Sequence, residues 1–152
     1  MNLKISGNIN SLKGTINLTA SKSESNRALI IRELCDQNFT INNLSESDDT
    51  RVLKELLEKI KKGETVLNVG IAGTVMRFLT AYLSTKDGEY ILTGEERMKE
   101  RPIEVLVDAL NQIGANISYQ ENIGYPPLVI IGNELKSGKI KIDGSVSSQY
   151  IS

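Results

Sequence analysis

Hydroxyl and basic side chains gather at residues 21–27, where the sequence reads Ser-Lys-Ser-Glu-Ser-Asn-Arg. This segment opens a stretch in which apolar residues recur with helical spacing, among them Ile31 and Leu34. The first turn of a helix carries unpaired backbone N–H groups and the positive end of the helix dipole. With Lys22 and Arg27 beside them, these groups suit an anion, above all a phosphate. An ordinary helix cap with solvated charges explains the same residues, because serine is a favoured cap.

Two later segments repeat this order of a strand-like run, then small or hydroxyl residues, then a helix. Their small and polar residues are Gly73 and Thr74 in the first segment and Ser147, Ser148 and Gln149 in the second. If the three helix starts converge, they form one anion pocket lined by N–H groups, hydroxyls and cations. The basic residues that would join them are Lys22, Arg27, Arg77 and Arg97. Each helix start contributes only about 0.3–1 kcal/mol toward a charge, so convergence matters.

Each of these features also has a structural explanation. Gly70 and Gly73 suit a tight turn, because neither a P-loop nor a dinucleotide fingerprint is complete there. An isolated arginine such as Arg77 usually forms a surface salt bridge. Residues 97–101 are dense in charge and fit a solvated loop as well as an anion clamp. Asp48-Asp49 could be paired carboxylates for acid–base chemistry, but their place before a helix favours a capping role.

The composition is that of a soluble globular chain, since 39% of its 152 residues are apolar and 24% are charged. A net charge of −1 gives no overall attraction for nucleic acid or a membrane surface, so any anion site must be local. The absence of histidine removes the commonest general base and metal ligand. No apolar run has the length of a membrane span or a signal peptide, which favours a cytoplasmic protein. The single cysteine, Cys35, sits in an apolar helix face and is predicted to be a buried thiol.

The apolar pattern predicts helices that alternate with strands. Glycines suit the ends of two helices at Gly63 and Gly114, and Pro102 suits the first turn of another. Helices are expected at residues 23–35, 52–60, 75–83 and 102–113, and strands at residues 2–9, 15–20, 39–44, 64–68, 89–93, 116–120, 128–131 and 139–143. This order indicates an α+β fold of mixed α/β layers, with helices packed on sheets.

Four motifs then occur in order along the chain. They are Ser21-Lys22-Ser23-x-Ser25-Asn26-Arg27-Ala28-Leu29, Ala72-Gly73-Thr74-x-Met76-Arg77, Thr93-Gly94-Glu95-x-Arg97-Met98-Lys99-Glu100-Arg101-Pro102-Ile103 and Asp143-Gly144-Ser145-Val146-Ser147-Ser148-Gln149-Tyr150. Together they resemble the enolpyruvylshikimate-phosphate synthase family, the 3-phosphoshikimate 1-carboxyvinyltransferases of chorismate and aromatic amino-acid biosynthesis. The resemblance runs from about residue 4 to Ser152. It implies transfer of the enolpyruvyl group of phosphoenolpyruvate to the 5-hydroxyl of shikimate 3-phosphate, with release of phosphate. It implies no metal and no organic cofactor.

The resemblance also implies roles for individual residues. Those implied to bind shikimate 3-phosphate are Lys22, Ser23, Arg27, Ser147, Ser148 and Gln149. Those implied to lie on the phosphoenolpyruvate side are Lys22, Gly73, Arg97 and, again, Gln149, with Thr74 and Arg77 in supporting positions. No catalytic residue is assigned in this part of the sequence, although Lys22 comes closest. Ile71 departs from the family, which commonly has asparagine before Ala-Gly-Thr.

The family enzyme has two domains, and this chain resembles only the first part of it. The implied fold is therefore one incomplete domain of two, built from the β-α-β-α-β-β repeat units of the enolpyruvyl transferase fold. Residues 1–14 would be a strand segment that packs with the other domain, and residues 15–152 an incomplete N-terminal domain. The acidic groups that handle protons would lie in the missing C-terminal domain, so this chain is expected to lack turnover alone.

Two alternatives remain open from the sequence. A relative of UDP-N-acetylglucosamine enolpyruvyl transferase would share fold and chemistry, but it usually carries a catalytic cysteine in a glycine-rich loop, a context that Cys35 lacks. A non-catalytic anion-binding module, complete at 152 residues, is the other alternative.

Overall fold

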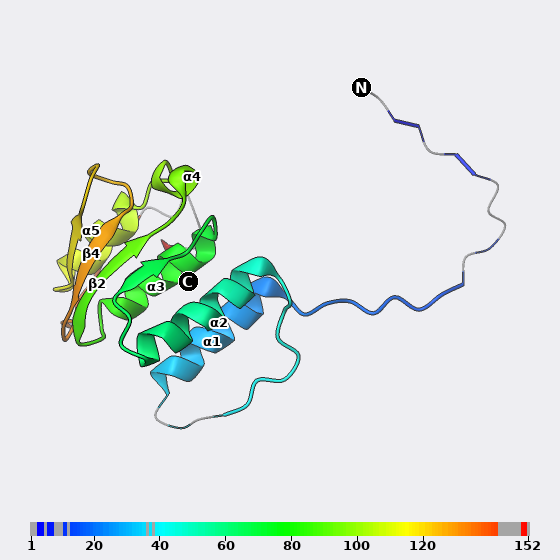
Figure 1. Ribbon diagram of the computed structural model, residues 1–152, viewed down its shortest axis with the longest axis horizontal. Helices are drawn as coiled ribbons and strands as arrows, with labels where there is room; N and C mark the ends of the chain where they lie inside the picture. Colours follow the sequence, from blue (N-terminus) through cyan, green and yellow to red (C-terminus); the bar gives the residue numbers. More distant parts are fainter. Residues whose placement is uncertain are drawn as a thin grey trace.

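The computed structural model describes residues 3–4, 6–7, 11, 13–35, 37, 39–142 and 150–151. Helices and strands alternate along these residues and form a mixed α/β fold (Figure 1). The helices are α1 (Lys22–Leu34), α2 (Asp48–Lys61), α3 (Gly73–Leu83), α4 (Glu96–Lys99) and α5 (Glu104–Gln112), and the strands are β1 (Val66–Asn68), β2 (Gly88–Thr93), β3 (Asn116–Tyr119) and β4 (Leu128–Gly132). The mixed helix-and-sheet class predicted from the sequence is confirmed.

The strands form one mixed sheet in the order β1-β2-β4-β3. β1 and β2 are parallel, with Leu67 opposite Leu92, and α3 is the crossover between them. β4 is antiparallel to both β2 and β3. Because β1 and β2 end at the same edge, the loops that lead to α3 and α4 lie side by side there. The backbone N–H of Glu95 donates to the carbonyl of Gly70 across these loops, at 3.1 Å.

The helices α1, α2 and α3 run in the same direction and begin at the same end of the molecule, on the right in Figure 1. α3 packs against α2 on one side and against β2 and β4 on the other. Its sequence is apolar on nearly every face, which is typical of a helix enclosed by other elements. This arrangement brings the two predicted helix starts at Lys22 and Gly73 to the same end of the fold.

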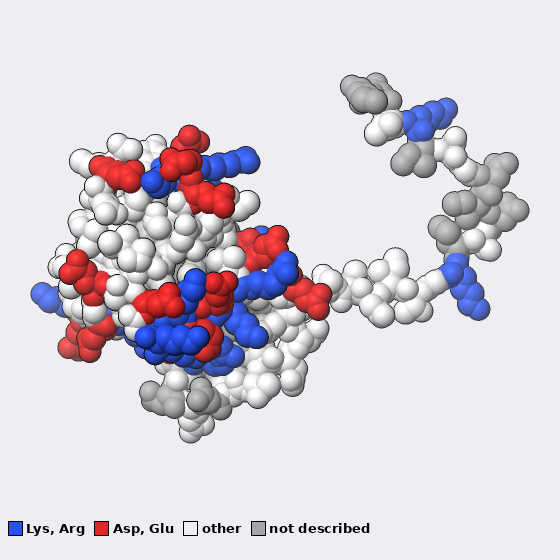
Figure 2. All heavy atoms as spheres, viewed as in Figure 1, with Lys and Arg blue, Asp and Glu red and all other residues white. Residues whose placement is uncertain are grey.

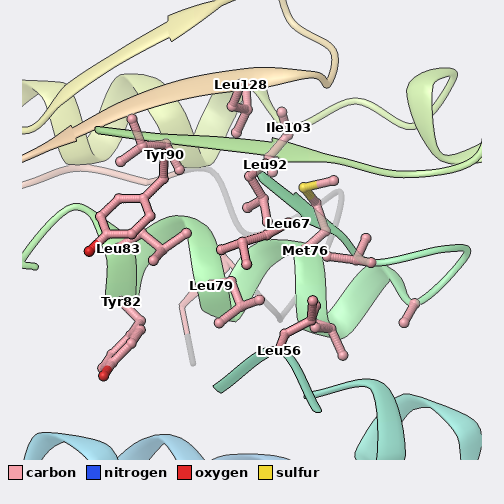
Figure 3. Packing of buried hydrophobic residues seen from close by; sticks show 14 of the residues in the cluster. Leu56, Leu67, Met76, Leu79, Tyr82, Leu83, Tyr90, Leu92, Ile103 and Leu128 are labelled. Carbon is pink, nitrogen blue, oxygen red and sulfur yellow. The ribbon is translucent and has the colours of Figure 1, made fainter. Parts of the chain in front are cut away.

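The hydrophobic core lies between α3 and the sheet (Figure 3). Leu67 and Leu92 project from the two parallel strands toward Met76, Leu79 and Leu83 on α3. All five side chains are at most 1% exposed. Burial of each is worth roughly 1.5–3 kcal/mol, so this layer holds α3 firmly in place.

The strands predicted at residues 15–20 and 39–44 are wrong, because the described chain forms no ladder there. Residues 13–20 instead run clear of the helices (Figure 1), with Ile16 and Leu18 85% and 88% exposed. Alternation of apolar residues marks a segment suited to a strand, but a strand also needs a neighbour to pair with. The strands predicted at 2–9 and 139–143 lie partly outside the described residues, and their described residues are also unpaired.

Three smaller predictions are also corrected. Cys35 is exposed rather than buried, because it caps α1 at its C-terminal end and no element of the described residues covers the outer face of that helix. Pro102 precedes the N-cap of α5, Ile103, whose non-helical backbone (φ −136°) lets its side chain enter the core. Residues 97–101 are not simply a loop, since they include part of the short helix α4. The helix ends expected at Gly63 and Gly114 are confirmed, with φ of 85° and 98°.

Acidic and basic side chains are interleaved over the face seen in Figure 2 rather than separated into patches of one sign. On α2 they pair along the helix, as in Lys59 with Glu55 and Lys61 with Glu58. Among the described helices, none combines the length and the apolar character that a membrane span requires.

Candidate functional site

The start of α1 is a capped helix terminus with cations on its first turns. The Ser21 hydroxyl accepts a hydrogen bond from the N–H of Glu24 at 3.4 Å, which confirms the predicted N-cap. Lys22 and Ser23 follow on the exposed first turn. Arg27 donates to the Ser23 carbonyl at 3.3 Å, and its guanidinium lies 5.9 Å from the centre of the Phe78 ring on α3. These residues therefore form one polar surface at the end where α1 and α3 begin.

Lys22 is neutralised by an acidic residue of the neighbouring helix. Its Nζ lies 3.3 Å from Oδ2 of Asp49, and its side chain is 47% exposed. Asp48 and Asp49 occupy the first turn of α2, while Ser47 is its N-cap. The prediction of a capping role for the aspartates is thus refined: they lie one step inside the cap, and Asp49 pairs with Lys22. An anion that reaches Lys22 must compete with this ion pair.

Sequence reasoning missed the buried polar residues that hold the starts of α1 and α2 together. The Ser25 hydroxyl accepts from the N–H of Ser45 at 2.9 Å, and Thr50 donates its hydroxyl proton to Oδ1 of Asn26 at 2.8 Å. Ser25 and Asn26 are 6% and 0% exposed. Their place in the motif, between the exposed Ser23 and Arg27, hid this role. The available signal was their position on the inward side of the helix, shared with Leu29.

The start of α3 is built on a glycine with no space for a side chain. Gly73 is buried and follows Ala72, an N-cap with no side-chain hydrogen bond. A Cβ at Gly73 would lie 2.5 Å from a terminal nitrogen of Arg101 and 3.0 Å from a terminal nitrogen of Arg77. Glycine is therefore required so that two guanidinium groups can approach the backbone. Thr74 follows in the first helical turn and is half-buried.

Arg77 is a buried structural arginine rather than a surface one. It is 8% exposed, donates to the Gly73 carbonyl at 2.9 Å, and lies 5.2 Å from the centre of the Tyr150 ring. Its Nε has no hydrogen-bond partner among the described residues. The salt bridge considered for Arg77 is absent from the described part of the chain. Its contacts instead stiffen the first turns of α3.

Arg97 lines a cavity of about 400 Å³ beside the start of α3. The described residues of its wall are Ile71, Arg97, Met98, Glu100 and Arg101. No carboxylate of the described residues lies within ion-pair distance of Arg97, whereas the neighbouring Lys99 pairs with Glu96 and Glu121. The burial of Met98 fixes α4 to the core and turns Arg97 and Arg101 toward the cavity.

Two of the three predicted helix starts are thus brought to one end of the molecule. The residues at these two helix starts are Lys22, Ser23 and Arg27 on α1 and Gly73, Thr74 and Arg77 on α3. The loop that leads to α4, which carries Arg97, adjoins the start of α3 through the Glu95–Gly70 hydrogen bond. The third predicted start, with Ser147, Ser148 and Gln149, lies outside the described residues. Within the part of the chain that the structure describes, no three metal-ligating side chains cluster. The cations and helix-start N–H groups at this end suit the binding of an anion.

Comparison with known proteins identifies the family to which the chain is similar. The family described as EPSP synthase (3-phosphoshikimate 1-carboxyvinyltransferase) matches residues 7–62 and 54–152 of this chain. The chain belongs to the EPSP synthase family. The resemblance stated from the four motifs is therefore confirmed.

Curated relatives carry the name 3-phosphoshikimate 1-carboxyvinyltransferase. One from Bacteroides fragilis (strain YCH46) is 51% identical over 141 residues, which are 93% of this chain and 34% of the relative. One from Psychromonas ingrahamii is 48% identical over 163 residues, covering 91% of this chain and 38% of the relative. The chain thus spans little more than a third of the length of these relatives.

A solved structure, EPSP synthase from Acinetobacter baumannii, has the same fold over 91% of this chain and 36% of its own length. The TM-score is 0.79 at 23% sequence identity. The agreement confirms the predicted fold class, an EPSP synthase fold of which this chain forms part.

Proposed function

We propose that this chain takes part in transferring the enolpyruvyl group of phosphoenolpyruvate to the 5-hydroxyl of shikimate 3-phosphate, with release of phosphate. The observation that carries the proposal is that α1 and α3, whose first residues are Lys22 and Gly73, start at the same end of the fold, with Arg97 lining a cavity beside the α3 start. Relatives of this chain bear this activity in their names. Both substrates are phosphorylated carboxylates, and this end offers cations, hydroxyls and helix-start N–H groups.

On the shikimate 3-phosphate side, we assign binding to Lys22, Ser23 and Arg27. Their exposure at the first turns of α1 supports this assignment, because a bound anion can reach them without displacing the core. The helix start adds about 0.3–1 kcal/mol toward a negative charge. Ser147, Ser148 and Gln149 remain part of the proposed site on the strength of the motif alone.

On the phosphoenolpyruvate side, we assign binding to Gly73 and Arg97, with Lys22 reaching both substrates. The cavity beside Arg97 is large enough for a small phosphorylated acid, since a volume of about 400 Å³ is within the range of ligand pockets. Thr74 and Arg77 support this side by forming and stiffening the first turns of α3. Ile71 adds an apolar wall to the cavity.

We further propose that the described fold works with the remainder of a longer polypeptide, a C-terminal domain that supplies the proton-handling groups. Exposed apolar surface supports this, because Leu3, Ile16 and Leu18 are each more than 80% exposed. An apolar cavity of about 420 Å³ between α1, α3 and α5 adds to it. Residues 1–14 would pack with that other domain, and residues 15–152 would form part of the first. We also propose that the protein acts in the cytoplasm.

Calorimetry with shikimate 3-phosphate tests the binding half of the proposal. The wild-type chain is expected to release or absorb measurable heat at millimolar ligand. Lys22→Ala should weaken this binding by about tenfold, because one charge-assisted contact is lost. Glu24→Ala is the matched control, since Glu24 lies on the same exposed turn and carries no assigned contact. No heat with the wild-type chain, or equal binding by both variants, would contradict the assignment.

Phosphate release tests the other half. The purified chain is expected to release no phosphate from a mixture of both substrates. A longer polypeptide that continues past Ser152 into a second domain is expected to release it at a rate that depends on Lys22. Turnover by the chain alone would show that the second domain is not needed.

A further inference from the structure

The cavity beside the start of α3 contains a second arginine to which no role has been assigned. Arg101 follows α4 and lines the same wall as Arg97 and Ile71. Its side chain reaches back over the loop between β1 and α3, where a terminal nitrogen lies 3.5 Å from the carbonyl of Ile71. Arg101 therefore lies between the α4 side of the cavity and the N–H groups of the first turn of α3.

The charge of Arg101 is not balanced within the described structure. No carboxylate of the described residues lies within ion-pair distance of its guanidinium. Among the described residues, the guanidinium donates one long hydrogen bond, to the Ile71 carbonyl. Glu100 is the acidic side chain among the described wall residues, and it pairs with neither arginine. Two cations and one anion leave the wall with a positive excess.

The close approach of Arg101 to the backbone restricts position 73 to glycine. A Cβ at Gly73 would meet the Arg101 guanidinium at 2.5 and 2.9 Å, so the guanidinium rests directly on the α3 backbone. Arg77 approaches the same point from the other side, but its terminal nitrogen already donates to the Gly73 carbonyl. Like charges held near one point repel each other, and an anion placed between them relieves that repulsion.

We propose that Arg101 is a second anion-binding arginine of this cavity, which grips the phosphate of phosphoenolpyruvate together with Arg97. This inference rests on the proposed function and gives a role to a residue that belongs to a family motif but to which the resemblance assigns none. A guanidinium presents planar N–H pairs that match phosphate oxygens, and two such groups hold a dianion better than one. Arg101 binds the leaving group here and takes no proton from it.

Binding of two probes to the 152-residue chain tests the inference. Inorganic phosphate and phosphoenolpyruvate are titrated separately into the ¹⁵N-labelled chain, and the amide signals of Gly73 and Thr74 are followed by NMR. Arg101→Ala should weaken binding of both probes about tenfold or more, because a charge-assisted contact is lost. The affinity of Arg101→Lys for both probes should lie between that of the wild-type chain and that of Arg101→Ala, because lysine keeps the charge but lacks the planar pair of N–H groups. Glu100→Gln should strengthen binding severalfold by removing the negative charge from the wall.

Arg51→Ala is the matched control, because it removes the same charge from an exposed site on α2 where Arg51 pairs with Asp48. Equal binding by Arg101→Ala and Arg51→Ala would overturn the inference, as would a wild-type chain to which neither probe binds. The unchanged spectrum of the remaining amides checks that the variants are folded.

The outcomes separate this inference from the proposed function. A chain that binds shikimate 3-phosphate through Lys22, but phosphoenolpyruvate without dependence on Arg101, leaves the function standing and removes the inference. A chain that binds phosphate through Arg101 but does not bind shikimate 3-phosphate supports the anion site and contradicts the function.

Discussion

The starts of α1 and α3 both carry cations beside small or hydroxyl residues, but they hold those cations differently. At α1, Lys22 is paired with Asp49 and the helix is closed by a serine cap. At α3, the N-cap Ala72 makes no side-chain bond, and Arg97 and Arg101 have no acidic partner among the described residues. The α3 start is therefore already prepared for an anion, whereas the α1 start must first give up an ion pair.

The bodies of the two helices differ in the same sense. α3 is enclosed between the sheet and α2, with Leu79 fully buried. α1 lies at the margin of the fold and leaves Ile31 and Leu34 more than half exposed. The more enclosed helix, α3, carries one part of the proposed site, and the less enclosed helix, α1, carries the other. Four experiments address this difference, in order of decreasing expected effect.

Truncation of a leucine on each helix tests the difference in packing. Leu79→Ala should lower the free energy of unfolding by about 2–5 kcal/mol, because it leaves a cavity in the core. Leu34→Ala should change it by less than about 0.5 kcal/mol, because the side chain is 58% exposed. Urea denaturation measures both values. Similar losses for the two variants would show that α1 is covered in solution.

Gly73→Ala tests whether the α3 start depends on close approach of the arginines. The new methyl group would displace Arg101, so binding of phosphoenolpyruvate should weaken about tenfold. The unfolding free energy should change by only about 1 kcal/mol, because the displaced atoms are ends of side chains. Gly138→Ala is the control, since a Cβ there meets an ordinary contact at 3.6 Å. Unchanged binding with Gly73→Ala would contradict the required approach.

The burial of Tyr82 on α3 can be tested through the pH dependence of the free energy of unfolding. Burial, with the nearby charges of Glu33 and Tyr90, raises the pKa of Tyr82 to about 12. The folded state thus favours the neutral phenol, so its stabilising contribution is complete below about pH 10 and is lost as the pH rises toward 12. The loss at pH 11 should be about 1 kcal/mol.

Tyr82→Phe should remove this part of the pH dependence in urea denaturation between pH 9 and about pH 11.5. Tyr119, whose pKa burial also raises to about 12, keeps its own contribution in that variant. A pH profile identical to that of the wild-type chain would mean that Tyr82 is open to solvent.

Asp49→Asn should give the smallest effect and tests the ion pair at α1. Removal of the carboxylate leaves Lys22 without its partner, so shikimate 3-phosphate should bind two- to fivefold more tightly, in line with about 0.2–1 kcal/mol for an exposed pair. Asp48→Asn is the control, because Asp48 pairs with Arg51 instead. Calorimetry at low salt measures both. Weaker binding by Asp49→Asn would show that Asp49 positions Lys22 rather than restrains it.

The helices could be predicted from the sequence because their signals are local. The apolar stripe of α2, the serine cap of α1 and the glycines after α2 and α5 all act within one or two turns. The strands β1, β2, β3 and β4 were predicted to within about two residues for the same reason, since each has a buried apolar centre.

The strands at residues 15–20 and 39–44 could not be decided in this way. Ile16 and Leu18 alternate with polar residues as in a half-buried strand. This alternation indicates that the segment can form a strand, but it does not indicate whether a partner strand is present. Within the site, the cations were visible as residue types. The Lys22–Asp49 pair, the buried Asn26 and the place of Arg101 against Gly73 depend on which helices adjoin, which no local pattern contains.

The contact between the loops after β1 and β2 has a mechanical consequence. Gly70 has a φ of 59°, and a Cβ at Gly94 would lie 2.7 Å from the Gly70 carbonyl. Because these loops are in close contact, a shift of one displaces the other. We therefore expect Arg97, Arg101 and the first turn of α3 to move together as one rigid unit. An anion that draws Arg97 inward would carry the α3 terminus with it, and the slowing of amide hydrogen exchange should then spread from Glu95 to Gly70 as a single step.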